Sequence, residues 1–251
     1  MFILICAPDD TSALWARDGL VRRGVVPFEL IFADSLVTDI GWEHRFEDGR
    51  VSTDLMLRDG RRIRNDEVSG VLNRLSILRQ SALPLFQPSE RYYVAHEFQA
   101  LLLSWLHSLS VPVINRPTPL GLSGRLRHVS EWIWLASRAG LPNRGYSQSS
   151  QDTPQFWDFH VRLVDNGSPV ATVIVANGEV TGATVPPDIQ AGCRRLSELS
   201  KASLLGIDFV VLEDMSWQFA GVSTSPDLRF GGEPLLDALA TALNRQEEAR
   251  P

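Results

Sequence analysis

The stretch Phe2-Ile3-Leu4-Ile5-Cys6-Ala7-Pro8-Asp9-Asp10 decides the class of fold. Its first six residues are apolar and are followed at once by a proline and two acids. This pattern is typical of a buried parallel strand and the loop at its carboxyl end. Residues 13–23 then show apolar side chains at helical spacing, and Gly24 ends that helix. With a second apolar run at 28–32, this strand–helix–strand order predicts an α/β protein that opens with a Rossmann-like domain.

Short alternating segments replace this pattern over residues 42–64. They are interrupted by Asp48-Gly49 and Asp59-Gly60, and Asp-Gly pairs between alternating runs are strong hairpin signals. We therefore expect an inserted hairpin at 42–64. A long amphipathic helix is predicted at 90–109, and the first domain is expected to span residues 1–117.

The second half of the chain is predicted to be α+β. Residues 118–145 are expected to form a helical joint around a helix at 123–139, and residues 146–251 a second domain. Asn166-Gly167 and Asn177-Gly178 favour hairpin turns, so this domain should contain an antiparallel sheet. The predicted strands are 156–164, 170–176, 180–185, 206–213 and 217–223, and the predicted helices are 188–203 and 235–245.

Composition and charge argue against several classes of protein. The 251 residues are 44% hydrophobic and 22% charged, which is typical of a folded chain. The net charge of −6 argues against a nucleic-acid partner, because such binding needs a basic face. No apolar run approaches the roughly 20 residues that span a bilayer, so we expect no membrane partner and a cytoplasmic location. Two cysteines, Cys6 and Cys193, are too few for a disulfide framework.

Lysine is nearly absent from the sequence. Of 24 basic residues, Lys201 is the only lysine, which excludes any mechanism that needs two. The five histidines are dispersed without the spacing of a metal-binding helix. We therefore assign no metal ligands.

Polar side chains follow several of the strands predicted for the first domain. Open α/β sheets bind ligands at the carboxyl edge of their strands, and arginine suits bidentate recognition of a carboxylate or phosphate. Each residue also has a structural interpretation, as a helix cap or a surface charge. The candidate cleft residues in this domain are Asp9, Asp10, Asn73, Arg74, Asn115 and Arg116.

The inserted hairpin carries four arginines around one turn: Arg58, Arg61, Arg62 and Arg64. On an acidic protein this basic hairpin predicts a grip on an acidic peptide, which would add a strand to its exposed edge. The alternative is a solvated hairpin whose charges protect an edge strand from pairing.

The order of these pieces, together with several local motifs, resembles the ATP-grasp proteins. The resemblance is to the peptide-modifying ligases near the ribosomal-S6 glutamate ligase and the graspetide macrocyclases. It implies a Rossmann-like pre-ATP-grasp domain followed by a truncated ATP-grasp-like domain with an antiparallel sheet. The segments that carry it are Val71-Leu72-Asn73-Arg74, 90–108, Val113-Ile114-Asn115-Arg116-Pro117, 135–142, Gly206-Ile207-Asp208-Phe209 and 219–226.

The sequence departs from this family at the phosphate and metal sites. ATP-grasp ligases form an acyl-phosphate that an amine attacks, which requires cations and divalent metals on the phosphates. The resemblance places Asp208 near one family metal ligand, and we add it to the candidate cleft. However, Gly221 and Ser223 stand where the family has Glu and Asn. No lysine opens the helix near 127–129, and 145–156 leaves room only for a loop where the family has a phosphate-binding subdomain.

Three functions remain open. The leading hypothesis is a non-catalytic ATP-grasp-like protein without a cofactor. It would bind a peptide, a partner enzyme or a small ligand, and the resemblance implies peptide-tailoring biosynthesis as the setting. The first alternative is an active ATP-dependent carboxylate–amine ligase, with arginines on the phosphates and Mg²⁺ on Asp208 with Glu213 or Asp214. The second is a structural homodimer packed through tryptophan-bearing helices, such as the one with Trp132 and Trp134.

Overall fold

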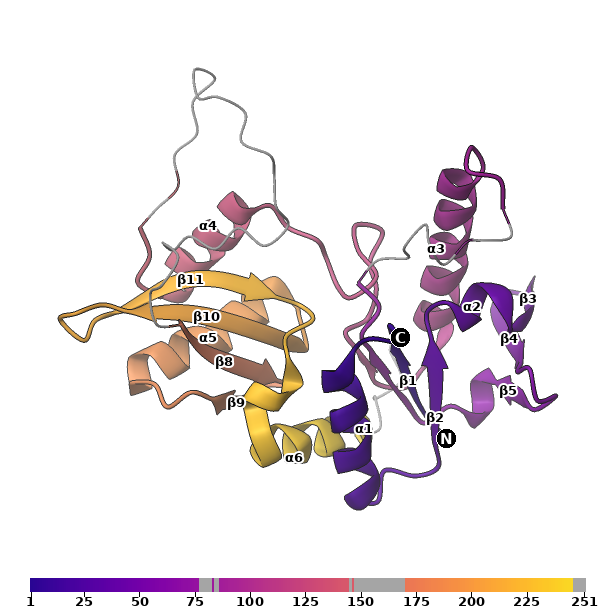
Figure 1. The fold of residues 1–251 in the computed structure, drawn as a ribbon, viewed down its shortest axis with the longest axis horizontal. Helices are drawn as coiled ribbons and strands as arrows, with labels where there is room; N and C mark the ends of the chain where they lie inside the picture. Colours follow the sequence, from indigo (N-terminus) through magenta and orange to yellow (C-terminus); the bar gives the residue numbers. More distant parts are fainter. Residues whose placement is uncertain (77–82, 84–85, 145, 147–169, 246–251) are drawn as a thin grey trace. The chain divides into compact units, whose positions relative to one another are not determined.

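The computed structural model describes residues 1–76, 83, 86–144, 146 and 170–245, which form a mixed α/β protein (Figure 1). Its described strands form one parallel sheet and two antiparallel sheets. The chain divides into two compact units. The first is Met1–Leu126 with the segment from Leu236 onward, and the second is Arg127–Leu235. Each unit has its own apolar core.

A four-stranded parallel sheet forms the centre of the first unit, in the order β2-β1-β6-β7. Every residue of β1 is buried, because β1 has a neighbouring strand on both sides and apolar side chains on both faces. The strands are β1 (Phe2–Cys6), β2 (Phe28–Phe32), β6 (Gly70–Asn73) and β7 (Val113–Ile114).

Helix α1 (Thr11–Arg22) connects β1 to β2, as the sequence predicts. It begins at the Asp10 cap and is followed by Gly24 at φ +79°, a backbone conformation that favours glycine. Helix α6 (Gly232–Leu243) contributes Leu236 to this unit. A Cβ atom at Gly19 would lie 2.4 Å from the Leu236 Cδ1 atom, so glycine permits this close packing.

The predicted hairpin region is a three-stranded antiparallel sheet in the order β3-β4-β5. Asp48 (φ +51°) and Gly49 (φ +72°) form the two-residue turn between β3 and β4, since a type I′ turn needs positive φ at both positions. The short helices α2 (Ser35–Thr38) and η1 (Asn65–Glu67) flank this sheet and were not predicted. The strands are β3 (Gly41–Glu47), β4 (Arg50–Met56) and β5 (Arg62–Arg64).

Helix α3 (Arg91–Ser108) packs on this sheet. The Trp42 ring contacts the Trp105 ring edge-on at 5.4 Å between centroids, and a His44 ring nitrogen lies 2.9 Å from the Ser104 hydroxyl. Trp105 is 1% exposed and belongs to the apolar core of the unit. No described helix combines the length and the apolar character that crossing a bilayer requires.

The second unit contains an antiparallel sheet in the order β11-β10-β8-β9. Helices α4 and α5 share one apolar cluster with β8 and β10, so they cover one face of the sheet. The predicted strand 156–164 and the Asn166-Gly167 turn lie outside the described residues. The elements are α4 (Val129–Ala139), β8 (Val170–Ala176), β9 (Glu179–Gly182), α5 (Pro187–Ser200), β10 (Leu204–Val211), β11 (Trp217–Ser223) and η3 (Leu228–Gly231).

We expect Trp105→Ala to lower the free energy of unfolding of the first unit by about 3–5 kcal/mol, because it leaves a large cavity in the core. Tyr93→Ala on the same helix is the control, since Tyr93 is 66% exposed and its loss should change stability little. Urea unfolding followed by circular dichroism measures both. Equal effects of the two substitutions would contradict the packing described for α3.

Candidate functional site

Asp10 and Arg74 meet at the carboxyl edge of the parallel sheet. The Arg74 Nε atom donates to Asp10 Oδ2 at 3.0 Å, and the Arg74 side chain is 4% exposed. Its Nη2 atom donates to the Ser12 hydroxyl at 3.2 Å. Asp10 also caps α1 by accepting from the Ala13 amide at 2.9 Å. The structure therefore brings these two candidates into direct contact at the first turn of α1.

Charge and hydrogen bonding set the pKa of Asp10. Burial raises the pKa of this carboxyl, but the charge of Arg74 and hydrogen bonds from Arg74, Ala13 and Ser12 outweigh burial and hold the pKa below its usual range. The Arg74 Nη1 atom is buried and has no hydrogen-bond partner among the described residues. A buried donor group of this kind is costly until an acceptor reaches it, so the Nη1 group of Arg74 is unused within the described residues.

Asn73 and Asn115 are joined within the same unit. The Asn73 amide donates to the Asn115 carbonyl at 2.9 Å and to the Leu122 carbonyl at 2.7 Å, and its oxygen accepts from the Leu75 amide at 3.1 Å. Both asparagines are almost fully buried. Asn73 thus connects the end of β6 to the chain after β7.

Arg116 and Asp9 lie in different surroundings from Arg74. The Arg116 guanidinium donates to the carbonyls of Leu106 at 2.7 Å, Leu109 at 3.1 Å and Val111 at 2.8 Å. These bonds satisfy carbonyls at and just after the end of α3. Asp9 is exposed in the turn before α1. Of the six candidates in this unit, Asp10 and Arg74 are the two that form an ion pair within the described residues.

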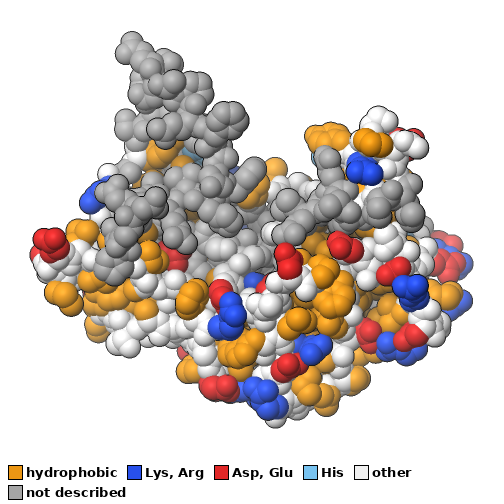
Figure 2. Space-filling view, in the orientation of Figure 1, with side chains coloured by type: hydrophobic (Ala, Val, Ile, Leu, Met, Phe, Trp, Pro, Cys, Tyr) orange, Lys and Arg blue, Asp and Glu red, His pale blue; other side chains and the backbone are white. Residues whose placement is uncertain are grey.

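Acidic neighbours neutralise much of the arginine hairpin. Arg61 contacts Glu29 at 2.7 Å and Asp59 at 2.7 Å. Arg58 lies 3.9 Å from Asp39, and Arg64 lies 3.8 Å from Asp54. Arg62 is exposed. Basic and acidic side chains are intermingled over the visible face of this unit (Figure 2), which favours a solvated hairpin over a basic grip.

In the second unit, Asp208 lies half-buried in β10 and accepts a hydrogen bond from the Thr172 hydroxyl at 2.7 Å. Its partner across β11 is Gly221, and its partner across β8 is Thr172. A β-bulge follows between Asp208 and Phe209. No carboxylate therefore faces Asp208 from either neighbouring strand.

The described residues around Asp208 do not fit a magnesium site. Mg²⁺ takes hard oxygen ligands in near-octahedral geometry, chiefly from carboxylates. Asp214 lies in the turn beyond β10, more than about 10 Å along the strand from Asp208. It accepts hydrogen bonds from the Ser216 amide and hydroxyl, which lower its pKa. Among the described residues, no three His, Cys, Asp or Glu side chains gather as a metal site.

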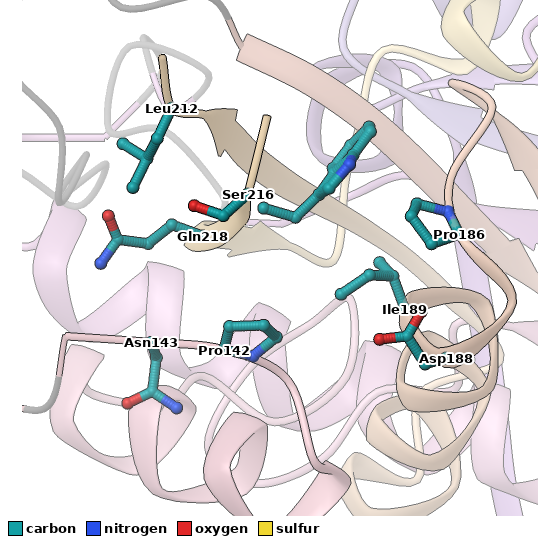
Figure 3. Close-up of a pocket in the computed structure, with 9 residues that line it drawn as sticks. Pro142, Asn143, Pro186, Asp188, Ile189, Leu212, Ser216 and Gln218 are labelled. Carbon is teal, nitrogen blue, oxygen red and sulfur yellow. The ribbon is translucent and has the colours of Figure 1, made fainter. Parts of the chain in front are cut away.

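A pocket of about 440 Å³ opens at the hairpin end of this unit (Figure 3). Trp217 supplies an aromatic wall, and its ring packs edge-on against Phe209 at 5.8 Å between centroids. Asp188, at the start of α5, is the one ionisable side chain among the described lining residues. No local sequence pattern predicts this pocket, although Pro186-Pro187 marks the start of α5. The lining residues are Pro142, Asn143, Pro186, Asp188, Ile189, Leu212, Ser216, Trp217 and Gln218.

No protein-family model matches the sequence, and a search of curated proteins finds no match. Solved structures nevertheless show that the chain has the fold of ATP-grasp ligases. Since the identities are below 20%, the likeness concerns the fold alone.

Three similar structures illustrate this fold. A RiPP-associated ATP-grasp ligase from Chryseobacterium gregarium, in complex with ADP and a leader and core peptide, has a TM-score of 0.69 at 12% identity, over 98% of both chains. The macrocyclase MdnC of Microcystis aeruginosa, bound with precursor peptide MdnA, has a TM-score of 0.72 at 13% identity, over 97% of this chain and 99% of that one. The D-alanine-D-alanine ligase of Aeromonas hydrophila has a TM-score of 0.52 at 16% identity, over 98% of this chain and all of that one.

We expect Asp10→Asn to destabilise the protein by about 2 kcal/mol near pH 7 and far less near pH 3. The lowered pKa means that the Asp10 carboxylate stabilises the fold above the usual carboxyl range, and that this contribution is lost as the pH falls through the folded-state pKa. Asparagine keeps the cap but not the charge.

Urea unfolding of both proteins at the two pH values provides the measurement. Asp18→Asn is the matched control, because Asp18 is exposed and its ion pair in the described part of the chain is with Arg17 on the protein surface. An equal loss of stability at both pH values would show that the charge of Asp10 has no role.

Proposed function

We propose that this protein is a non-catalytic member of the ATP-grasp fold that binds a peptide in peptide-tailoring biosynthesis. In this proposal the first unit is the Rossmann-like pre-ATP-grasp domain, and the second is a truncated ATP-grasp-like domain. The alternatives are an active ligase, which would bind ATP, and a scaffold for a partner enzyme, which would bind no peptide.

The observation that carries the non-catalytic part is the pairing of Asp208 with Gly221. An acyl-phosphate mechanism needs metal ions that bridge phosphate oxygens, and each ion needs several oxygen ligands. Asp208 has one oxygen already engaged by Thr172 and faces a residue without a side chain. Lys201, the one lysine of the chain, caps α5 and is exposed at that helix end.

The peptide-binding part is supported by the pocket at the β10–β11 hairpin. Its lining is predominantly apolar, with polar groups from Asn143, Ser216 and Gln218 at its rim (Figure 3). Such a combination suits an apolar peptide segment whose backbone needs hydrogen-bond partners. Asp188 would favour a basic residue in that segment. Two of the similar structures, the Chryseobacterium gregarium ligase and MdnC, are complexes with a peptide.

We expect calorimetry to show no saturable binding of ATP in the presence of Mg²⁺, because the second unit lacks the ligands that a nucleotide-bound metal needs. Binding in the micromolar range that Asp208→Ala abolishes would instead establish the ligase alternative. Thermal unfolding of the same sample verifies that the protein is folded.

We expect Ser216→Trp to weaken peptide binding by at least about tenfold, because the indole would fill the pocket without removing core packing. Ser216 is exposed, so the substitution leaves the apolar cluster intact. The measurement is fluorescence binding of the strongest hits from an array of short apolar peptides that each contain one basic residue.

Glu198→Trp is the matched control, because Glu198 is exposed in the last turn of α5, whereas the pocket lies at the first turn. If the two variants bind the peptide equally well, the peptide does not bind in this pocket. Binding to neither variant nor to the parent protein would reject the peptide function.

A further inference from the structure

Strand β3 is an edge strand of the β3-β4-β5 sheet, and in the described part of the chain it pairs with β4 alone. Its seven residues, Gly41-Trp42-Glu43-His44-Arg45-Phe46-Glu47, include no proline, and its charged side chains are of both signs, so a second strand can complement them. Phe46 is 73% exposed near the end of this strand. We propose that β3 pairs antiparallel with β3 of a second copy of this chain.

The turn between β3 and β4 determines which backbone groups face the free edge. Because Asp48 and Gly49 form a two-residue turn, Glu47 and Arg50 make the hydrogen-bonded pair that closes it. Pairs alternate along an antiparallel ladder, so every second residue of β3 directs its N–H and C=O away from β4. These residues are Trp42, His44 and Phe46.

Only some registers let these outward groups meet the same groups of a second copy. In the register centred on His44, His44 pairs with its own counterpart and Trp42 pairs with the second copy's Phe46. Glu43 then lies opposite the second copy's Arg45, and Arg45 opposite its Glu43. These two charged positions form non-hydrogen-bonded pairs, in which side chains approach most closely.

Charge complementarity selects this register over its neighbours. A shift by two residues in one direction places Glu43 opposite Glu43, and in the other direction it places Arg45 opposite Arg45 and Glu43 opposite Glu47. Like charges directly opposite one another destabilise a sheet. The register centred on His44 also uses all seven residues of the strand and satisfies the two-fold symmetry of a homodimer.

The neighbouring strand adds a reason for a cation at this edge. Glu43 lies directly opposite Asp54 in β4, so two carboxylates are adjacent on the outward face. Arg64 of β5 approaches Asp54 at 3.8 Å from one side. Within one chain Arg45 contacts Glu43. The second copy's Arg45 would give this row of acids a further cation from the opposite side.

The register centred on His44 also gives the exposed Phe46 ring a partner. Trp42, His44 and Phe46 lie on the face of the sheet that α3 covers, where Trp42 contacts Phe98 and Trp105 and His44 contacts Ser104. Phe46 extends past this cover. Opposite the second copy's Trp42 it would gain an aromatic cross-strand partner, a pairing that stabilises antiparallel sheets. A second copy therefore supplies both the charge and the apolar surface that β3 lacks.

Charge reversal tests the pairing. We expect sedimentation velocity to show a monomer–dimer equilibrium for the full chain. Glu43→Arg alone, or Arg45→Glu alone, should raise the dissociation constant at least about tenfold, because each creates like-charge pairs at two symmetric places. The double variant Glu43→Arg/Arg45→Glu should restore the parent value. Arg22→Glu, a reversal at an exposed position of α1, should leave it unchanged.

Hydrogen exchange of the backbone amides provides an independent measurement. It uses the parent protein, so it does not depend on whether a variant folds. As the protein concentration rises, hydrogen exchange should slow at the amides of Trp42, His44 and Phe46, while those of Glu43 and Arg45 stay protected by β4 throughout. A monomer at every concentration overturns the proposal. So does a dimer that the single reversals do not weaken, or slower exchange at β3 produced only by an added acidic peptide.

Discussion

The buried ion pair of Arg74 and Asp10 is the interaction on which the first unit depends. The Arg74 amide donates to the Ile5 carbonyl, which joins β6 to β1, and its guanidinium joins both strands to the first turn of α1. Removing one partner of such a pair would leave an uncompensated charge in a nearly dry site, which costs more than the intact pair contributes. The carboxyl edge of the sheet is therefore held to the first turn of α1 by this pair. The Nη1 group of Arg74 remains without a partner there among the described residues.

Most of the regular elements could be predicted from local pattern, for identifiable reasons. Strands β2, β8 and β11 have the predicted bounds, because each is an apolar or alternating run between turn residues. The short helix α2 escaped prediction, since four residues cannot show a helical period. Helix α4 begins at Val129 rather than at 123, because the His128 side chain accepts from the Ser130 amide and caps the helix there. No apolar pattern encodes such a cap.

The candidate site was less predictable than the fold. The sequence places Asn73 and Arg116 at strand ends, but it does not reveal which groups their side chains contact. Asn73 bonds to two carbonyls and Arg116 to three, so both are engaged within the fold. The pocket escaped notice because its walls come from α5, the chain after α4 and the β10–β11 hairpin, which are far apart in sequence. The resemblance marks Asp208 and Gly221 as positions of family metal ligands, and the structure adds that the two residues pair across β10 and β11.

The β10–β11 hairpin holds the pocket and Asp208 at different places along its length. Asp208 and Gly221 pair in the body of the sheet, whereas Leu212, Ser216 and Trp217 line the pocket at its far end. Asp208 lies three residues before the end of β10, about 10 Å along the strand. The packing of Trp217 on Phe209 and Phe209 on Phe219 involves neither a metal nor a phosphate. Because the pocket and the Asp208–Gly221 pair lie at different places on the hairpin, the proposed peptide binding does not depend on a carboxylate at position 221.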